Sequence, residues 1–249
     1  MNRVHIGTMG WSYKFWVGNF YPAGTTSDKY LLEYSKHFNT VEVDNTFYRI
    51  PYQTTVMNWR DHTPGDFLFS AKFPRAITHD KLLKHCEEIV GRFIERISDL
   101  RNKLGPMLIQ LPPEFNLDHI QTLSDFTAAL PKEYRYVVEV RNRGLVNDEL
   151  YSLLRKNGIA LAFVDHPFLP RIDTVTADFA YIRLEGDRRN VKGTLGKVER
   201  DRTNDIEQWA DMTKSLLSLN QEVFIYISKY YSGHPPTDAV NLLRFLARN

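Results

Sequence analysis

Residues 38–49 read FNTVEVDNTFYR, and this stretch places a carboxylate within what is otherwise an apolar β-strand. Side chains alternate between the two faces of a strand, so Val41 and Val43 share one face while Glu42 points to the other. An unpaired charge is too costly to bury in an ordinary core. We therefore expect Glu42 to belong to a polar cluster at one end of a barrel.

Eight short segments have the composition of strands, and helical patterns separate nearly all of them. Eight such units over 249 residues predict an α/β fold, a single (β/α)8 TIM-type barrel forming one domain over residues 1–249. One crossover, around residues 166–178, is predicted to be irregular. A doubly wound sheet is the rival, but no Gly-rich turn follows the first strand. The predicted strands are residues 3–8, 40–43, 67–71, 107–111, 136–140, 159–164, 179–184 and 222–228.

The clearest helical pattern covers residues 80–104, where apolar residues recur at three- and four-residue spacing. Cys86 lies on this apolar stripe, so we interpret it as a packing residue. Asn147 is expected to cap a later helix that ends at Gly158. Asn204 and Glu207 have capping-box spacing ahead of a helix that runs through Leu217. The other predicted helices are residues 27–38, 54–61, 118–130 and 237–246.

The bulk composition is that of a soluble globular protein, with 43% hydrophobic and 25% charged residues. The formal net charge of +2 is too small to indicate nucleic-acid binding by itself. Cys86 is the single cysteine, which rules out an internal disulfide and fits a reducing compartment. No apolar run approaches the roughly 20 residues that span a bilayer. These features predict a cytoplasmic protein without a membrane partner.

Charged and polar residues collect where the predicted strands end. In barrels of this type the loops after the strands build the site at the C-terminal face. We therefore predict a ligand site there, and mutual pairing of the charges is the alternative explanation. The residues concerned are Glu42, Asn45, Lys72, Gln110, Glu139, Arg141, Asp165, Arg183, Glu185 and Tyr226.

The residue types at this rim suggest acid–base chemistry. Glu42, Glu139 and Asp165 are carboxylates that could divide the roles of acid and base. Lys72 would act either as an amine that forms a Schiff base or, as we favour, as a counter-ion. His5, His166 and His234 show no ligand spacing, so we expect no catalytic transition metal and no cofactor, and leave a divalent ion open.

Two loops would complete the site. Residues 186–202 carry six basic residues against three acidic ones, and loops after the last two strands of such barrels often bind phosphate. Residues 9–26 are rich in aromatics, including Trp11, Trp16 and Tyr21. These aromatics would either stack on a sugar or base, or plug the rim as a small satellite core.

Six stretches of the chain also resemble one known family. They are IGTMGWSYKFWVGNFYP (6–22), FNTVEVDNTFYRIP (38–51), FLFSAKFPRAITH (67–79), KLGPMLIQLPPEF (103–115), TADFAYIRLEG (176–186) and GHPPTDA (233–239). On these motifs the chain is similar to the YecE-like family, catalogued as domain of unknown function 72 (DUF72). The resemblance implies a TIM-type barrel and no settled activity. It also implies a loose grouping with barrels such as xylose isomerase and endonuclease IV.

The resemblance assigns rim positions residue by residue. By motif, the family positions are Trp11, Glu42, Asn45, Tyr48, Arg49, Lys72, Gln110, Glu139, Arg141, Asp165, Arg183 and His234. The chain departs from the family pattern at several of its rim positions. Asp44 stands where the family has asparagine, and Asn45 where it commonly has serine. The other departures are Asn142, Leu145, Glu185 and Ser228–Tyr230.

Three functions remain, in order of preference. The first is an enzyme that uses carboxylate acid–base chemistry on a small polar or anionic molecule resembling a sugar phosphate. The second is a non-catalytic ligand-binding protein, which the altered rim motifs would suit. The third is a nucleic-acid binding or phosphodiester-cleaving protein. The sequence carries no signal for the oligomeric state.

Overall fold

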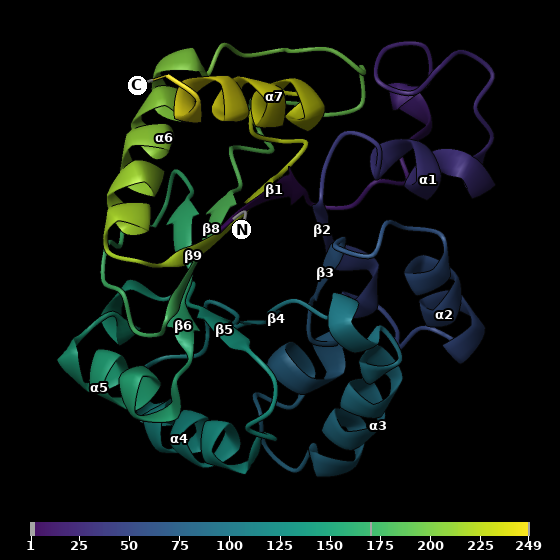
Figure 1. The fold of residues 1–249 in the computed structure, drawn as a ribbon. Coiled ribbons are helices and arrows are strands. Elements are labelled where there is room, and N and C mark those ends of the chain that lie inside the picture. Colours follow the sequence, from purple (N-terminus) through teal and green to yellow (C-terminus); the bar gives the residue numbers. More distant parts are fainter. Residues whose placement is uncertain (1–2, 170, 249) are drawn as a thin grey trace.

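The computed structural model describes residues 3–169 and 171–248, with helices arranged around the strands (Figure 1). Met1, Asn2, Pro170 and Asn249 lie outside the described residues. The strands are β1 (Val4–Thr8), β2 (Thr40–Val43), β3 (Leu68–Ala71), β4 (Met107–Gln110), β5 (Tyr136–Glu139), β6 (Ala160–Leu161), β7 (Phe163–Asp165), β8 (Phe179–Leu184) and β9 (Glu222–Ile227). The α-helices are α1 (Tyr30–Tyr34), α2 (Gln53–Asp61), α3 (Glu87–Ser98), α4 (Ile120–Ala129), α5 (Asp148–Asn157), α6 (Thr203–Ser218) and α7 (Pro235–Leu246).

Every strand pairing within the described residues is parallel. The ladders form three sheets with the orders β1-β9-β8-β7, β2-β3 and β4-β5-β6. Neighbours in these sheets are consecutive in the chain, as expected when helices connect parallel strands, except that β1 pairs with β9, the last strand. The predicted α/β class is therefore confirmed.

Isolated contacts join the three sheets to one another. A bridge between Met9 and Glu42 links the end of β1 to β2, and a bridge between Lys72 and Leu108 links the end of β3 to β4. Ala162 separates β6 from β7. No continuous ladder crosses these joints among the described residues, so closure into one barrel stays a prediction.

The joint between β1 and β2 depends on a side chain. The Tyr34 hydroxyl accepts a hydrogen bond from the Thr8 amide at 2.8 Å and donates one to the Thr40 carbonyl at 3.0 Å. The two strands approach so closely that a Cβ at Gly7 would lie 2.1 Å from the Thr40 oxygen. Glycine is therefore required at this position, because any side chain would collide with the backbone.

Several sequence predictions agree closely with the structure. The predicted strands at residues 40–43 and 179–184 coincide with β2 and β8. Asn147 caps α5, its side chain accepting a hydrogen bond from the Leu150 amide at 2.9 Å. Gly158 ends that helix with a φ of 64°. These are local signals, because each depends on a few adjacent residues.

The predicted helix over residues 80–104 was wrong at its start. A π-helical turn (Ala76–Asp80) follows β3, and Leu82, Leu83 and His85 have positive φ angles, so α3 begins only at Glu87. Leu83 and Cys86 are nevertheless buried. The apolar pattern is thus satisfied by a tight turn, and the interpretation of Cys86 as a packing residue is consistent with its burial.

Two further predictions need correction. The predicted strand at residues 159–164 is interrupted at Ala162. The predicted capping box of Asn204 and Glu207 is not formed: α6 begins at Thr203, whose amide donates to the Asp201 side chain at 2.8 Å. An acidic residue just upstream therefore satisfies the first amide of the helix.

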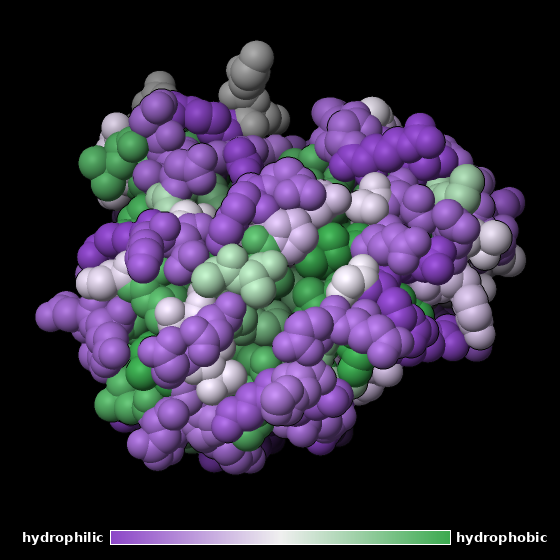
Figure 2. All heavy atoms as spheres, turned by 90° about the horizontal axis from the view of Figure 1, so that it is seen from below, coloured by the Kyte–Doolittle hydropathy of each residue, from purple (hydrophilic) through white to green (hydrophobic). Residues whose placement is uncertain are grey.

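Aromatic residues of the loop after β1 form a satellite core. Trp16 and Tyr21 are almost fully buried and pack against each other, with ring centroids 5.8 Å apart. Apolar residues also gather in the middle of the face that carries α3 and α4 (Figure 2). A groove of about 640 Å³ lies between these helices and is lined in part by Val90, Ile94 and Phe126.

Candidate functional site

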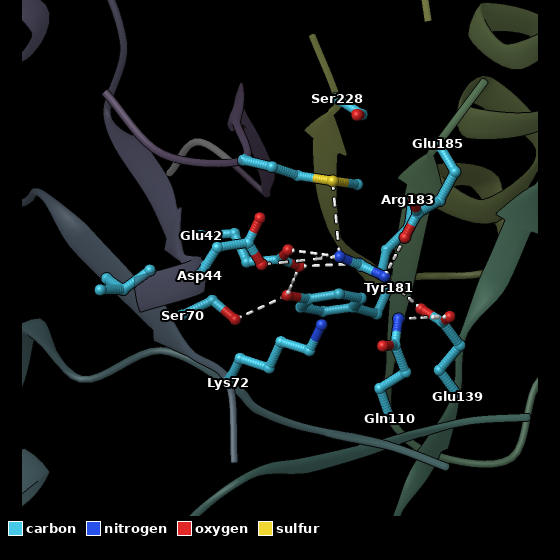
Figure 3. A network of polar contacts seen from close by, with 12 residues as sticks. Glu42, Asp44, Ser70, Lys72, Gln110, Glu139, Tyr181, Arg183, Glu185 and Ser228 are labelled. Atoms are coloured by element: carbon cyan, nitrogen blue, oxygen red, sulfur yellow. Dashed lines mark hydrogen bonds and ion pairs between the residues drawn. The ribbon is translucent and has the colours of Figure 1, made fainter. Parts of the chain in front are cut away.

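A single arginine forms the centre of the polar cluster where the strands end. Arg183 lies on β8, and only 1% of it is exposed. Its Nη2 lies 2.7 Å from Glu42 Oε1 and its Nε donates to Glu42 Oε2 at 2.9 Å. Its Nη1 lies 2.5 Å from Glu139 Oε2 and also pairs with Glu185 (Figure 3). Glutamates from β2 and β5 and the glutamate directly after β8 thus fix the guanidinium that β8 carries.

Glu42 is held from two sides. Besides Arg183, the Tyr181 hydroxyl donates to its Oε2 at 2.6 Å, and the Ser70 hydroxyl lies 2.6 Å from that of Tyr181. Burial raises the pKa of Glu42 to about 7, against the opposing charge of Arg183 and with the like charge of Asp44 reinforcing the rise. Glu42 is therefore the carboxylate of the cluster that takes up a proton nearest neutral pH.

The other two buried glutamates remain ionised. Gln110 Nε2 donates to Glu139 at 2.8 Å, and Arg141 pairs with both Glu139 and Glu185. Burial alone would raise the pKa of Glu139, but Arg141 and Arg183 outweigh it and hold the pKa below its ordinary value. Burial is likewise outweighed at Glu185, where Arg183, Arg141 and Lys72 lower the pKa. Opposite charges at this distance favour the ionised form.

A cavity of about 610 Å³ opens above this cluster. Its lining comes from the C-terminal parts of strands and from the segments that follow them, which is where a parallel α/β fold places ligands. Aromatic and proline side chains supply the apolar walls. Those apolar lining residues are Met9, Tyr13, Phe47, Tyr48, Pro112, Pro113, Phe168 and Tyr230.

The charges that line the cavity are mainly positive. Three acidic residues face seven basic ones, and two histidines add to the lining. The acidic residues are Asp44, Glu185 and Asp187, and the basic residues are Lys72, Arg75, Arg141, Arg183, Arg188, Arg189 and Lys229. The buried Glu42 and Glu139, which lie beneath the cavity, reduce this excess of positive charge. Both are already paired with arginines.

Seven of the twelve predicted site residues come together here. Lys72, Tyr48, Gln110, Arg141 and Arg183 line the cavity. Glu42 and Glu139 lie directly beneath it, with no exposed surface. Their position is an observation, whereas their roles remain predictions.

The other five predicted residues lie elsewhere. Trp11 packs in the core against Trp59, with ring centroids 5.6 Å apart. Asp165 accepts hydrogen bonds from Trp209 Nε1 at 2.9 Å and Tyr231 at 3.1 Å.

His234 lies at the start of α7, with its Nδ1 2.8 Å from the Thr237 hydroxyl. Asn45 and Arg49 are exposed and do not line the cavity. Their motif positions thus place them near strand ends without directing their side chains to the cavity.

Sequence reasoning missed several cavity residues. Asp44 and Tyr13 were noted in the motifs but not assigned to the site, and both line the cavity. Lys229 also lines it, with its Nζ 5.2 Å from the centre of the Tyr13 ring. Tyr181 carries the signal that could have revealed its role, because it shares a strand face with Arg183.

The described residues include no group of three or more histidine, cysteine, aspartate or glutamate side chains arranged to hold a metal ion. The carboxylates of the cluster are instead occupied by arginines. In the described part of the chain, no helix is both long and apolar enough to cross a bilayer.

Comparisons with known proteins agree on one family. The family model described as "Protein of unknown function DUF72" matches residues 5–249. The UPF0759 protein YecE of Escherichia coli K12 is 40% identical over 167 residues, which cover 65% of this chain and 59% of YecE. The UPF0759 protein YunF of Bacillus subtilis is 24% identical over 98% of this chain and 94% of its own length.

Solved structures support the same relationship. A DUF72 family protein of Thermotoga maritima superposes with a TM-score of 0.84 at 25% identity, over 98% of this chain and 99% of that one. A methyltransferase from Methanosarcina mazei superposes with a TM-score of 0.54 at 10% identity, over 97% of this chain and 93% of that one. This second likeness concerns the fold alone.

Proposed function

This chain belongs to the DUF72 family, and from the geometry of its cavity we propose that it is an enzyme that binds a small anionic metabolite and moves a proton on it. A sugar phosphate has the required size and charge. We also propose that the strands close into one (β/α)8 barrel and that the chain is one cytoplasmic domain. The bridges of Met9 to Glu42 and of Lys72 to Leu108 support the closure.

One observation carries the proposal: the cavity has a basic lining whose central arginine is immobilised. Arg183 is held by three glutamates, and its Nη2 also lies 3.8 Å from Asp44 Oδ1, so its guanidinium is fixed in place instead of being a mobile side chain. Preorganised charge of this kind stabilises an anion without the cost of rearrangement. Arg188 and Lys229, which follow β8 and β9, extend the positive surface toward solvent.

Proton transfer requires a group that reaches the ligand. Glu42 and Glu139 are fully buried and bound to Arg183, so they would act as positioning residues. Asp44 lines the cavity, and its Oδ1 accepts no hydrogen bond from the described residues, although it lies 3.8 Å from Arg183 Nη2. We assign the role of general base to Asp44, with Lys72 as the cationic partner beside the ligand. Asp165 takes no part in this proposal, because Trp209 and Tyr231 occupy it.

Calorimetric titration with inorganic phosphate tests the binding step. We expect saturable binding that weakens at least tenfold in Arg188→Met, because a cation at the cavity is lost. Arg155→Met is the matched control, since Arg155 is an exposed arginine on α5, away from the cavity. Equal phosphate binding by the two variants would contradict the proposal.

The catalytic step needs a substrate, which a panel of phosphorylated sugars and carboxylic acids can provide. Turnover that is lost in Asp44→Asn, with ligand affinity retained, would support an enzyme. Saturable binding without product from any panel member would favour the alternative, a non-catalytic ligand-binding protein.

Nucleic-acid binding is a second candidate, favoured by exposed aromatics at the cavity mouth. Tyr48 is 81% exposed and Phe168 is 50% exposed, and Arg189 lies over the Phe168 ring. Aromatic faces beside basic side chains suit stacked single-stranded bases. This candidate predicts oligonucleotide binding that falls steeply with salt, and absence of that dependence would remove it.

A further inference from the structure

The basic residues that line the cavity fall into two groups. One group is held by carboxylates of the chain, and it consists of Arg75, Arg141, Arg183 and Arg189. Within residues 3–169 and 171–248, the side chains of the other group lie against aromatic rings and pair with no carboxylate. This second group consists of Lys72, Arg188 and Lys229. Its charges are therefore available to a ligand.

Two of these cations, Arg188 and Lys229, share one aromatic side chain. They follow β8 and β9, which pair along their whole length. The Arg188 Cζ and the Lys229 Nζ each lie 5.1 Å from the centre of the Tyr230 ring, and Lys229 Nζ lies 5.2 Å from that of Tyr13. Aromatic rings attract a cation without neutralising it. Arg188 and Lys229, the outer pair, thus present two positive charges to the cavity.

The third cation, Lys72, is more deeply buried and comes from a different sheet. It follows β3, and the Thr46 hydroxyl fixes its backbone by donating to the Lys72 carbonyl at 2.6 Å and accepting from its amide at 3.1 Å. Only 9% of Lys72 is exposed, and its Nζ lies 4.4 Å from the centre of the Phe47 ring. That contact stabilises a positive charge on the amine. Figure 3 shows the amine with no hydrogen bond or ion pair to the residues drawn.

The outer pair and Lys72 approach the cavity from opposite sides. In the view of Figure 3, Lys72 lies on one side of the Arg183 guanidinium, and Ser228, the residue before Lys229, lies on the other. The carboxylates nearest Lys72 are already bonded to arginines. A ligand that contacts both sets of charge therefore needs an anionic group at each end.

The amount of charge at each side indicates which anionic group belongs there. A phosphate ester carries a charge of about −1.5 to −2 at pH 7, which the two charges of the outer pair match, and the arginine fork fits its oxygens. A carboxylate carries a single negative charge, as one buried ammonium requires, because excess charge is costly to bury. We propose that the ligand is a phosphorylated carboxylic acid, with its phosphate on the outer pair and its carboxylate on Lys72. This inference rests on the proposed function, because it names the substrate class of the same cavity.

A series of phosphonocarboxylates tests the two-ended ligand. Phosphonoacetate, 3-phosphonopropionate and 4-phosphonobutyrate differ only in the spacing of their two anionic groups, and methylphosphonate lacks the carboxylate. In calorimetric titrations of the whole chain, we expect one member of the series to bind roughly tenfold more tightly than methylphosphonate, because it gains a charge-assisted contact with Lys72. A gain below about threefold for every member overturns the proposal.

Variants at the two ends separate the two contacts. Lys72→Met should abolish the gain and leave methylphosphonate affinity unchanged, which also shows that the variant is folded, whereas Lys72→Arg should keep the gain. Lys229→Met should weaken methylphosphonate and the phosphonocarboxylate alike. Lys156→Met, at an exposed position on α5, is the matched control and should change neither. A Lys72→Met variant that keeps the gain, or that weakens both ligands equally, overturns the proposal.

Failure of this inference and failure of the proposed function give different results. Suppose that methylphosphonate binds and that its affinity falls in Arg188→Met but not in Arg155→Met, while the added carboxylate gives no gain. The proposed function then stands and the phosphorylated acid is excluded. If neither methylphosphonate nor inorganic phosphate binds, both are overturned.

Discussion

Two clusters of arginine and glutamate lie at opposite ends of the strands, and they differ in depth. At the C-terminal ends, Arg183 holds three glutamates beneath the cavity. At the amino ends, Glu222 binds His5 Nε2 at 2.8 Å and Arg135 Nη1 at 2.5 Å. The side chain of Glu222 is 27% exposed and that of Arg135 is 45% exposed.

The difference distinguishes buried ion pairs, which fix charged groups beneath a cavity, from partly exposed ion pairs, which only pair charges at the amino ends of the strands. Removing a charge from water is expensive, and only good geometry with additional hydrogen bonds compensates for it. The Arg183 cluster is buried beneath the cavity despite this desolvation cost. We therefore infer that its position contributes to ligand binding. The Glu222 cluster keeps contact with solvent and is expected to contribute little stability.

The largest expected effect is that of Arg183→Met. The substitution leaves Glu42, Glu139 and Glu185 buried with fewer partners, so we expect a loss of about 3–5 kcal/mol in the free energy of unfolding. The same change at the other end, Arg135→Met, should cost at most about 1 kcal/mol. Urea unfolding measures both, and similar losses in the two variants would abolish the distinction between the clusters.

The second-largest expected effect is on the pH dependence of stability, which should have opposite signs for the two clusters. Because the folded-state pKa of Glu42 is raised from 4.5 to about 7, its contribution to stability is present below pH 4.5 and is lost as pH rises through 7. The hydrogen bond from His5 lowers the pKa of Glu222 to about 2, so its contribution is present above pH 4.5 and is lost as pH falls toward 2.

Glu42→Gln should therefore remove a decline in unfolding free energy of at most about 3 kcal/mol between pH 4.5 and 7. Glu222→Gln should leave that range unchanged and alter only the acid limb. Unfolding curves collected from pH 3 to pH 8 measure the two slopes. A wild-type profile that stays parallel to that of Glu42→Gln would show that Glu42 remains ionised throughout.

A smaller effect on the free energy of unfolding is expected when two tyrosines are replaced by phenylalanine. Tyr181 belongs to the cluster beneath the cavity, and Tyr136 lies near the amino ends of the strands. Tyr181→Phe removes the hydroxyl between Glu42 and Ser70 and should cost about 1–2 kcal/mol. Tyr136→Phe, at the start of β5, removes a buried hydroxyl that has no hydrogen-bond partner, so we expect no loss or a slight gain. Thermal unfolding of the two variants gives the comparison, and the reverse order would refute it.

The smallest expected effect is that of Glu222→Gln at neutral pH. A half-exposed ion pair contributes at most about 1 kcal/mol, and Glu222 lies at the opposite end from the cavity. Phosphate affinity should be the same as in the wild-type protein. A clear loss of affinity would mean that the amino ends of the strands influence the site.

The sequence was most informative where the signal is local. Alternation along FNTVEVDNTFYR was enough to predict that Glu42 faces a polar cluster, and Arg183 with Glu185 followed from the same period on β8. The cap of α5 and its terminal glycine were predicted from single residues. These predictions need no knowledge of distant partners.

The remainder depends on contacts between distant residues. Asp165 stands at a strand end like the other carboxylates, yet Trp209 and Tyr231 hold it away from the cavity. Trp11 matches a family motif, but its ring packs in the core. The sequence also gave no sign that α3 begins only at Glu87, because the buried apolar residues of the preceding turn have the same spacing as residues on a helix.

Tyr34 has a consequence for motion. Its phenol hydrogen-bonds both strands where β1 meets β2, and the Gly10 amide donates to the Glu42 carbonyl at 2.8 Å beside it, so this joint has a side chain and an isolated backbone bridge in place of a continuous ladder. Segments with few backbone hydrogen bonds open locally at lower free energy than those within a ladder. The amide of Thr8 should therefore exchange with deuterated solvent sooner than the laddered amides of β8. The joint between β1 and β2 should thus open locally before the ladder of β8 does.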